Sequence, residues 1–157
     1  MSTTPTTPHR VITRQVVEWA AWDWGSAAFN AVATTFVFTT YLTTNGVFTD
    51  HGTASSWLSI GMTIAGLFIA LLAPITGQRA DRRGRGGVWL GWFTGAVVLC
   101  MLAMYFVHPE SVLGPKGALM LGIALLGLGN VFFEFASVNY NAMLNHLGEK
   151  EDRGKIS

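Results

Sequence analysis

Residues 118–144 read ALMLGIALLGLGNVFFEFASVNYNAML, and this stretch is apolar on almost every side of a helix. It is longer than the ~20 residues that a helix needs to cross the hydrocarbon core of a bilayer. Four polar side chains interrupt it at offsets of 4, 3 and 4 residues, which keeps them on one helix face. We call this set the second stripe: Asn130, Glu134, Ser137 and Asn141. In lipid, such a face must turn toward other helices or a watery cavity.

The stretch 17–42 shows the same pattern near the start of the chain. Its polar side chains recur at offsets of 3, 4 and 4 residues and form the first stripe: Asp23, Ser26, Asn30 and Thr34. Each stripe contains one carboxylate and lies in a stretch too apolar and too long for an ordinary core helix. Both stripes are therefore typical of helices that line a transport pathway.

The composition of the whole chain fits a membrane protein. Of its 157 residues, 50% are hydrophobic and 12% are charged, against about 25% charged in soluble domains. Four stretches are long and apolar enough to cross a bilayer: 17–42, 55–75, 88–107 and 118–144. We therefore predict an all-α integral membrane protein with four transmembrane helices in a region from 16 to 147.

The basic residues predict the orientation of these helices. Nine of the ten lysines and arginines fall in three places, and Lys116 is the exception. The three places are the N-terminus (Arg10, Arg14), the connection after the second span (Arg79, Arg82, Arg83, Arg85) and the C-terminus (Lys150, Arg153, Lys155). With four crossings they share one side, which the positive-inside rule makes the cytoplasm. We expect a bacterial plasma membrane protein with a disordered cytoplasmic tail at 1–15 and a cytoplasmic loop at 148–157.

Several functional classes find no support in the sequence. The histidines lie in the tail and loops without ligand-like spacing, and Cys100 is the single cysteine. No nucleophile–base pairing or phosphate-binding loop is present, so we expect no enzyme, no cofactor and no metal site. The arginines follow the positive-inside pattern and do not indicate nucleic-acid binding. The tryptophans near the predicted span ends, Trp22 among them, are interpreted as interfacial anchors.

The connection after the second span carries a more specific motif. It reads GQRADRRGR from Gly77 to Arg85, a G-x-x-x-D-R-x-G-R pattern. Glycines permit a tight turn, and Asp81 can cap the next helix or pair with an arginine. A loop that only obeyed the positive-inside rule would need nothing beyond the arginines. The motif resembles the loop signature between the second and third helices of the major facilitator superfamily.

Two helix motifs narrow the resemblance. They are WAAWDWGSAAFN at 19–30 and FEFASVNYNAML at 133–144. They are similar to the first and fourth helices of the vacuole effluxer-like branch, which includes fungal vacuolar amino-acid exporters and bacterial relatives. The resemblance covers residues 18–157. Two positions depart from the loop signature: Arg79 stands where an apolar residue is usual, and Gly86 stands where a second basic residue is usual. These departures bear on how strongly the loop could act as a conformational latch.

The resemblance implies a fold of twelve helices in two six-helix halves. In that fold the first and fourth helices of each half line a central cavity, so both stripes would face it. The four spans would correspond to helices 1–4, and the stretch 152–157 would lead toward a fifth helix that this chain lacks. We therefore expect either a fragment of a longer transporter or a truncated gene product.

The predicted function is the N-terminal part of a secondary transporter, proton-coupled, that exports amino acids or similar small polar solutes. The candidates for proton coupling are Glu134 and Asp23. The candidates for lining the substrate cavity are Ser26, Asn30, Thr34, Asn130, Ser137 and Asn141. The candidates for a conformational latch are Gly77, Asp81, Arg82, Gly84 and Arg85. The expected partners are a small polar solute, membrane lipid, and the remaining transporter helices or further copies of the chain.

Other interpretations stay open at this point. The carboxylates and asparagines of the stripes can also hold helices together through hydrogen bonds, each worth only ~0.6 kcal/mol. A non-transporting four-helix protein that self-associates or scaffolds a partner is the alternative function. A small oligomeric transporter with a shared carboxylate is a third, and it would make the loop motif a coincidence.

Overall fold

The computed structural model describes residues 14–83 and 85–156, and side chains at 17, 18, 20–79 and 85–143. These residues form helices and turns without any strand, which confirms the predicted all-α fold. The elements are α1 (Arg14–Ala28), η1 (Phe29–Phe36), α2 (Val37–Thr43), α3 (His51–Arg83), α4 (Gly86–Met104) and α5 (Gly114–Ile156). Residues 1–13 of the tail predicted at 1–15, Gly84 and Ser157 lie outside the described residues, whereas residues 14 and 15 already belong to α1.

Three of these helices contain a stretch long and apolar enough to cross a membrane. The stretches are His51–Arg79 in α3, Gly86–Met104 in α4 and Gly114–Met143 in α5. The predicted first span, 17–42, is helical as well, but it is divided into α1, η1 and α2, which follow one another without a break. Its middle part, η1, is a π-helix, in which a backbone N–H bonds to the carbonyl five residues earlier.

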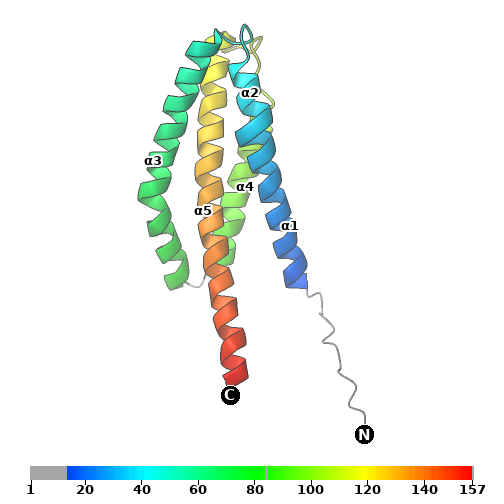
Figure 1. Cartoon of the computed structure of the whole chain (residues 1–157), viewed down its shortest axis with the longest axis vertical. Helices are drawn as coiled ribbons and strands as arrows, with labels where there is room; N and C mark the ends of the chain where they lie inside the picture. Colours follow the sequence, from blue (N-terminus) through cyan, green and yellow to red (C-terminus); the bar gives the residue numbers. More distant parts are fainter. Residues whose placement is uncertain (1–13, 84, 157) are drawn as a thin grey trace.

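Helix α5 is the centre of the bundle. It packs along α4 on one side and along α3 on another, and the first helical run lies against it as well (Figure 1). Half of its most apolar stretch (50%) is buried inside the chain, against 11% for those of α3 and α4. The apolar surfaces of α3 and α4 are thus left for lipid or for other helices.

The two ends of the bundle differ in charge. The start of α1, the α3–α4 connection and the end of α5 lie at one end, which we call the Arg79 end (Figure 1). The α2–α3 and α4–α5 connections lie at the other end, which we call the Lys116 end. All basic residues in the described part of the chain except Lys116 therefore lie in segments that meet at this one end, while Arg10 lies outside that part. Its orientation in the membrane stays a prediction.

Two expected loops are helical in the structure. Helix α3 continues through 77–83, and α5 continues through 148–156. The sequence is misleading at the first of these places because Pro74 and Gly77 are helix breakers in water. Pro74 nevertheless lies inside α3, as neighbouring helices and polar side chains permit in membrane helices. The following Gln, Arg and Ala residues favour helix, so α3 extends almost to α4.

Short polar contacts fix the Lys116 end. The Tyr41 hydroxyl donates to the carbonyl of Val107 over 3.1 Å and ties α2 to the end of α4. Asp50 caps α3, since the Thr53 N–H donates to its carboxylate over 2.8 Å. That hydrogen bond lowers the pKa of Asp50 below its ordinary value. Leu42, which is fully buried, packs on Gly122 of α5 and completes the contact.

Glycines set the spacing between α3 and α5, which gives a test of the packing. A Cβ at Gly61 would collide with Ile123, whereas a Cβ at Gly66 would meet nothing within 4 Å. Because overpacking costs about 1–3 kcal/mol, we expect Gly61→Leu to lower the free energy of unfolding by that amount. Gly66→Leu, in the same helix, gains the same helix propensity without a collision. Unfolding of both variants in detergent measures the difference, and equal stabilities would contradict this packing.

Candidate functional site

Contacts on three sides of α5 define its remaining face. Phe132 and Phe135 meet Phe93 of α4, at ring distances of 6.4 and 5.5 Å. The side toward α3 carries Ile123, Gly127 and Val138, and the side toward α1 carries Phe133 and Tyr140. At 3.6 residues per turn, the second stripe falls between the α1 and α3 sides, opposite α4. We call this surface the open face of α5, because α1 and α3 stand apart on either side of it (Figure 1).

The side chains of the second stripe have no polar partner among the described residues. Asn130, Glu134 and Ser137 are half-buried and Asn141 is exposed. None of the four side chains makes a hydrogen bond or ion pair with any described residue. Hydroxyls elsewhere behave differently: Thr63, for example, donates to the Ser59 carbonyl of its own helix over 2.7 Å. The open face of α5 thus presents a carboxylate, two amides and a hydroxyl that are free to bind something else.

The first stripe is less uniform. Asp23 and Asn30 are exposed, whereas Ser26 and Thr34 are half-buried. The Ser26 hydroxyl donates to the carbonyl of Asp23 over 2.8 Å and is therefore satisfied within its own helix. The Thr34 hydroxyl is enclosed and has no hydrogen-bond partner. The stripe does not present four equivalent polar groups.

The π-helix explains this irregularity. Val37 donates its N–H to the carbonyl of Val32, and the Thr39 hydroxyl donates to the carbonyl of Thr34 over 2.7 Å. The backbone bond from Val37 to Val32 spans five residues, so a turn here holds more residues than an α-helical turn. The expected alignment of Asn30 and Thr34 with Asp23 assumed an α-helix throughout, so the directions of these side chains are shifted in this segment. Thr34 accordingly turns toward the interior of the bundle while Asn30 stays exposed.

Aromatic contacts bring the two stripes to the same half of the bundle. Trp22 stacks on Tyr140 with ring centroids 4.2 Å apart, and Phe29 lies 5.1 Å from Phe133. These pairs show that α1 runs antiparallel to α5, with both stripes extending from the middle of the bundle to its Arg79 end. Asp23 is also within electrostatic range of Tyr140, the residue before Asn141. The Asp23 end of the first stripe therefore lies near the Asn141 end of the second stripe.

Two features of this region were missed by sequence reasoning. Trp22, interpreted as an interfacial anchor, packs between helices and donates its indole N–H to the Thr94 hydroxyl of α4 over 3.3 Å. Trp22 and Phe29 are seven residues apart, which places both on one face of a helix, and this spacing could have indicated that Trp22 faces the bundle interior. Asn139 is buried, at 1% exposure. Its amide donates to the Phe135 carbonyl over 2.7 Å, while its Oδ1 has no partner in the described region.

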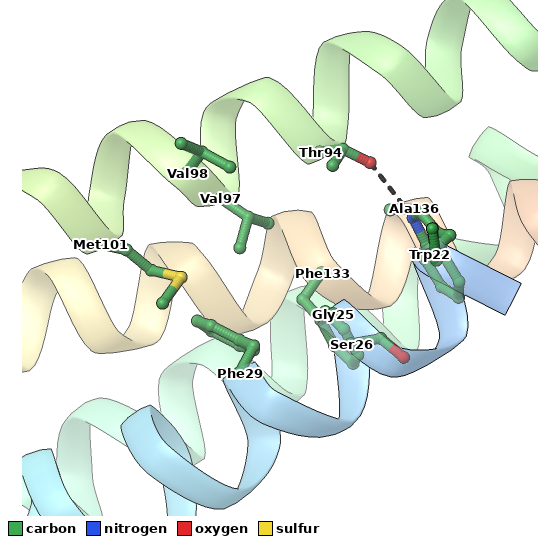
Figure 2. A pocket seen from close by; sticks show the side chains of 11 residues that line it. Trp22, Gly25, Ser26, Phe29, Thr94, Val97, Val98, Met101, Phe133 and Ala136 are labelled. Carbon is green, nitrogen blue, oxygen red and sulfur yellow. Dashed lines mark hydrogen bonds between the residues drawn. The ribbon is translucent and has the colours of Figure 1, made fainter. Parts of the chain in front are cut away.

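A cavity of about 190 Å³ lies between α1, α4 and α5. Figure 2 shows Trp22 and Thr94 at one end of it and Met101 near the other. Val97, Val98 and Phe133 supply most of the rest of its apolar wall. Of the predicted site residues, Ser26 alone lines it. This cavity is apolar and contains no carboxylate, so the polar site is the open face of α5.

The latch residues are described only in part. A Cβ at Gly77 would lie 2.8 Å from Val138, so this glycine allows close packing of α3 on α5. Arg85 is exposed at the start of α4 and makes no side-chain cap there. Asp81 and Arg82 belong to the last turn of α3, and their side chains lie outside the described part, as does Gly84. The latch role therefore stays a prediction.

One curated protein is similar to this chain over most of its length. It is named an uncharacterized MFS-type transporter, YxiO, from Bacillus subtilis (strain 168). The two sequences are 31% identical over 134 residues, which is 84% of this chain and 30% of the relative. The similarity supports membership of the major facilitator superfamily.

The other comparisons add no second relative. No family model matches the chain. No solved structure gives a significant match. The chain spans less than a third of the length of the transporter that it resembles, so the activity of a whole transporter is treated below as a proposal.

Proposed function

We propose that this chain is the N-terminal part of a secondary active transporter of the major facilitator superfamily. Within that family we assign it to the vacuole effluxer-like branch, which includes fungal vacuolar amino-acid exporters. In this proposal the transporter exports amino acids or similar small polar solutes in exchange for, or together with, protons. The similarity to a transporter and the polar open face of α5 support the proposal.

The unpartnered second stripe carries this proposal. An ionised carboxylate at the middle of a bilayer costs roughly 2.5–3.5 kcal/mol on insertion scales. Glu134 lies about 14 Å from the end of the apolar stretch of α5, at 1.5 Å per residue. At that depth the carboxylate needs water, a proton, a solute or a polar partner. The described helices supply no polar partner to it, so the stripe is suited to line a wetted pathway.

Proton coupling is assigned to Glu134, with Asp23 as the second candidate. A carboxylate that alternates between its protonated and ionised forms can link proton movement to solute movement. Glu134 is half-buried on the open face of α5, whereas Asp23 is exposed near the Arg79 end. The deeper position of Glu134 makes it the better coupling group. Asn30, Asn130 and Asn141 are assigned to the solute, which their amide groups can bind through both donors and acceptors.

The orientation and the latch complete the proposal. The three basic places at the Arg79 end would face the cytoplasm of a bacterial cell, with both termini on that side. Asp81, Arg82 and Arg85 would then hold the inward-facing side closed. The open face of α5 would be covered by further transporter helices.

Transport by the complete reading frame tests the proposal. Proteoliposomes loaded with a radiolabelled amino-acid mixture should release label faster when a pH gradient is imposed. A protonophore should remove that acceleration. Release that is unaffected by the gradient and by the protein would contradict the proposed function.

A further inference from the structure

We infer that the open face of α5 is a binding site for the cationic, amine-bearing end of the solute, with Glu134 as its counter-ion. This inference rests on the proposed transport function and deepens it. It names the chemical group that the N-terminal part of the transporter recognises. The observations that carry it are the distribution of charge and the unpartnered oxygen atoms of the second stripe.

The membrane-depth part of the chain is electronegative. No lysine or arginine lies between Arg14 and Arg79, between Arg85 and Lys116, or between Lys116 and Lys150. The apolar stretches nevertheless contain the carboxylates of Asp23 and Glu134. Neither carboxylate forms an ion pair with a described residue. A group that complements this surface must bring positive charge with it, because an unpaired buried charge is costly.

The arrangement of acceptors fits a primary ammonium group. Such a group has three N–H donors and no acceptor. Glu134 is flanked by Asn130 about 6 Å along the helix axis and by Ser137 about 4.5 Å along it in the other direction. All three present oxygen atoms on the same face and have no hydrogen-bond partner among the described residues. One ammonium group near Glu134 can therefore donate to the carboxylate and to the oxygen of one flanking residue, Asn130 or Ser137.

The packing around Glu134 adds no competing cation. The neighbouring residues on the α1 side are Phe133 and Tyr140, which Trp22 covers. On the α3 side, Gly61, Ala65 and Gly77 lie against α5. These residues are apolar or aromatic and bring no positive charge to the site. The attraction between the carboxylate and a cation beside such surfaces is stronger than in bulk water.

Carbodiimide labelling of Glu134 tests this inference on the whole chain in its membrane. Dicyclohexylcarbodiimide modifies carboxyl groups in apolar surroundings, and mass spectrometry of peptides reports the modified fraction at each one. The probe is propylammonium chloride, with 1-propanol and sodium propionate as matched compounds, all at one pH. We expect propylammonium to slow labelling of Glu134 at least threefold and the other two compounds to leave it unchanged. Glu110, which is exposed in the connection before α5, should stay unlabelled by this apolar reagent and is the negative control.

The variant Asn130→Leu separates binding from mere shielding by salt. It leaves the carboxylate in place and removes one of the neighbouring acceptors, so the protection by propylammonium should weaken. Equal protection by all three compounds, or none by propylammonium, would overturn the inference. If propylammonium gave no protection but a charged thiol reagent still modified the variant Ser137→Cys, the wetted pathway of the proposed function would stand without a cation site. If neither the carbodiimide nor the thiol reagent modified the stripe, the proposed function would fail together with the inference.

Discussion

Replacing Glu134 with glutamine should remove the dependence of solute movement on the proton gradient, and it should also weaken binding of an amine-bearing solute, for which this carboxylate is the proposed counter-ion. A transporter that couples one proton to one solute can hold a tenfold solute gradient for each unit of pH difference, since 1.4 kcal/mol corresponds to a factor of ten. Glutamine has nearly the shape of glutamic acid but cannot release a proton. The variant should therefore equilibrate the solute and accumulate none. The measurement is the steady-state solute ratio in proteoliposomes at several imposed pH differences.

Two variants serve as controls for this result. Glu134→Asp retains a titratable group on the open face of α5 and should keep a gradient-dependent solute ratio, with a lower rate. Asp23→Asn removes the carboxylate that is exposed near the Arg79 end, and it should change the ratio less than Glu134→Gln does. A solute ratio in Glu134→Gln that still rises tenfold per pH unit would show that another group carries the proton.

Replacing Trp22 with alanine should produce the largest loss of stability among single changes in α1. The indole stacks on Tyr140 and Phe133 and donates a hydrogen bond to Thr94, so it joins α1 to both α4 and α5. Large-to-small changes of aromatic residues cost about 3–5 kcal/mol in cores. We expect about 3 kcal/mol, because Trp22 is half-buried. Thermal unfolding of the purified protein in detergent measures the change.

Matched variants separate packing from anchoring. Trp24 lies in the same helix but is 80% exposed, so Trp24→Ala should change stability by less than 1 kcal/mol, as surface substitutions usually do. Trp22→Phe keeps an aromatic ring and loses the bond to Thr94, which is worth about 0.5–1.5 kcal/mol. If Trp22→Ala and Trp24→Ala were equally stable, the interior position of Trp22 would be wrong.

The helical, membrane-spanning character of the chain and the alignment of the second stripe on α5 could be predicted from the sequence. Apolar length alone located α3, α4 and α5, since crossing a bilayer requires about 20 residues whatever the fold. The second stripe kept its predicted alignment, because the middle of α5 is a regular α-helix. Regular helical geometry is the condition under which spacing in a sequence translates into a face.

The structure differs from the sequence-based predictions where the helix is not a regular α-helix, or where contacts between helices determine the burial of a side chain. The π-helix around Asn30 and Thr34 rotates side chains in a way that no spacing rule for α-helices anticipates. Pro74 ends a helix in water but not here, where α3 packs on α5. The burial of Trp22 and Asn139 depends on which helices lie against their faces. Those contacts join residues far apart in the chain, so local sequence pattern does not contain them.

Cysteine accessibility along α5 tests the central claim, that the open face of α5 lines a wetted pathway. Cysteines are placed at 130, 134, 137 and 141 in a Cys100→Ser background, with Leu128→Cys and Leu99→Cys as controls on apolar surfaces. Leu128 lies on the same helix, is 49% exposed and falls on another face. A membrane-impermeant, charged thiol reagent should modify the four stripe positions and spare both controls, because the thiolate that reacts forms only in water. Stripe positions as unreactive as Leu128→Cys would contradict the claim.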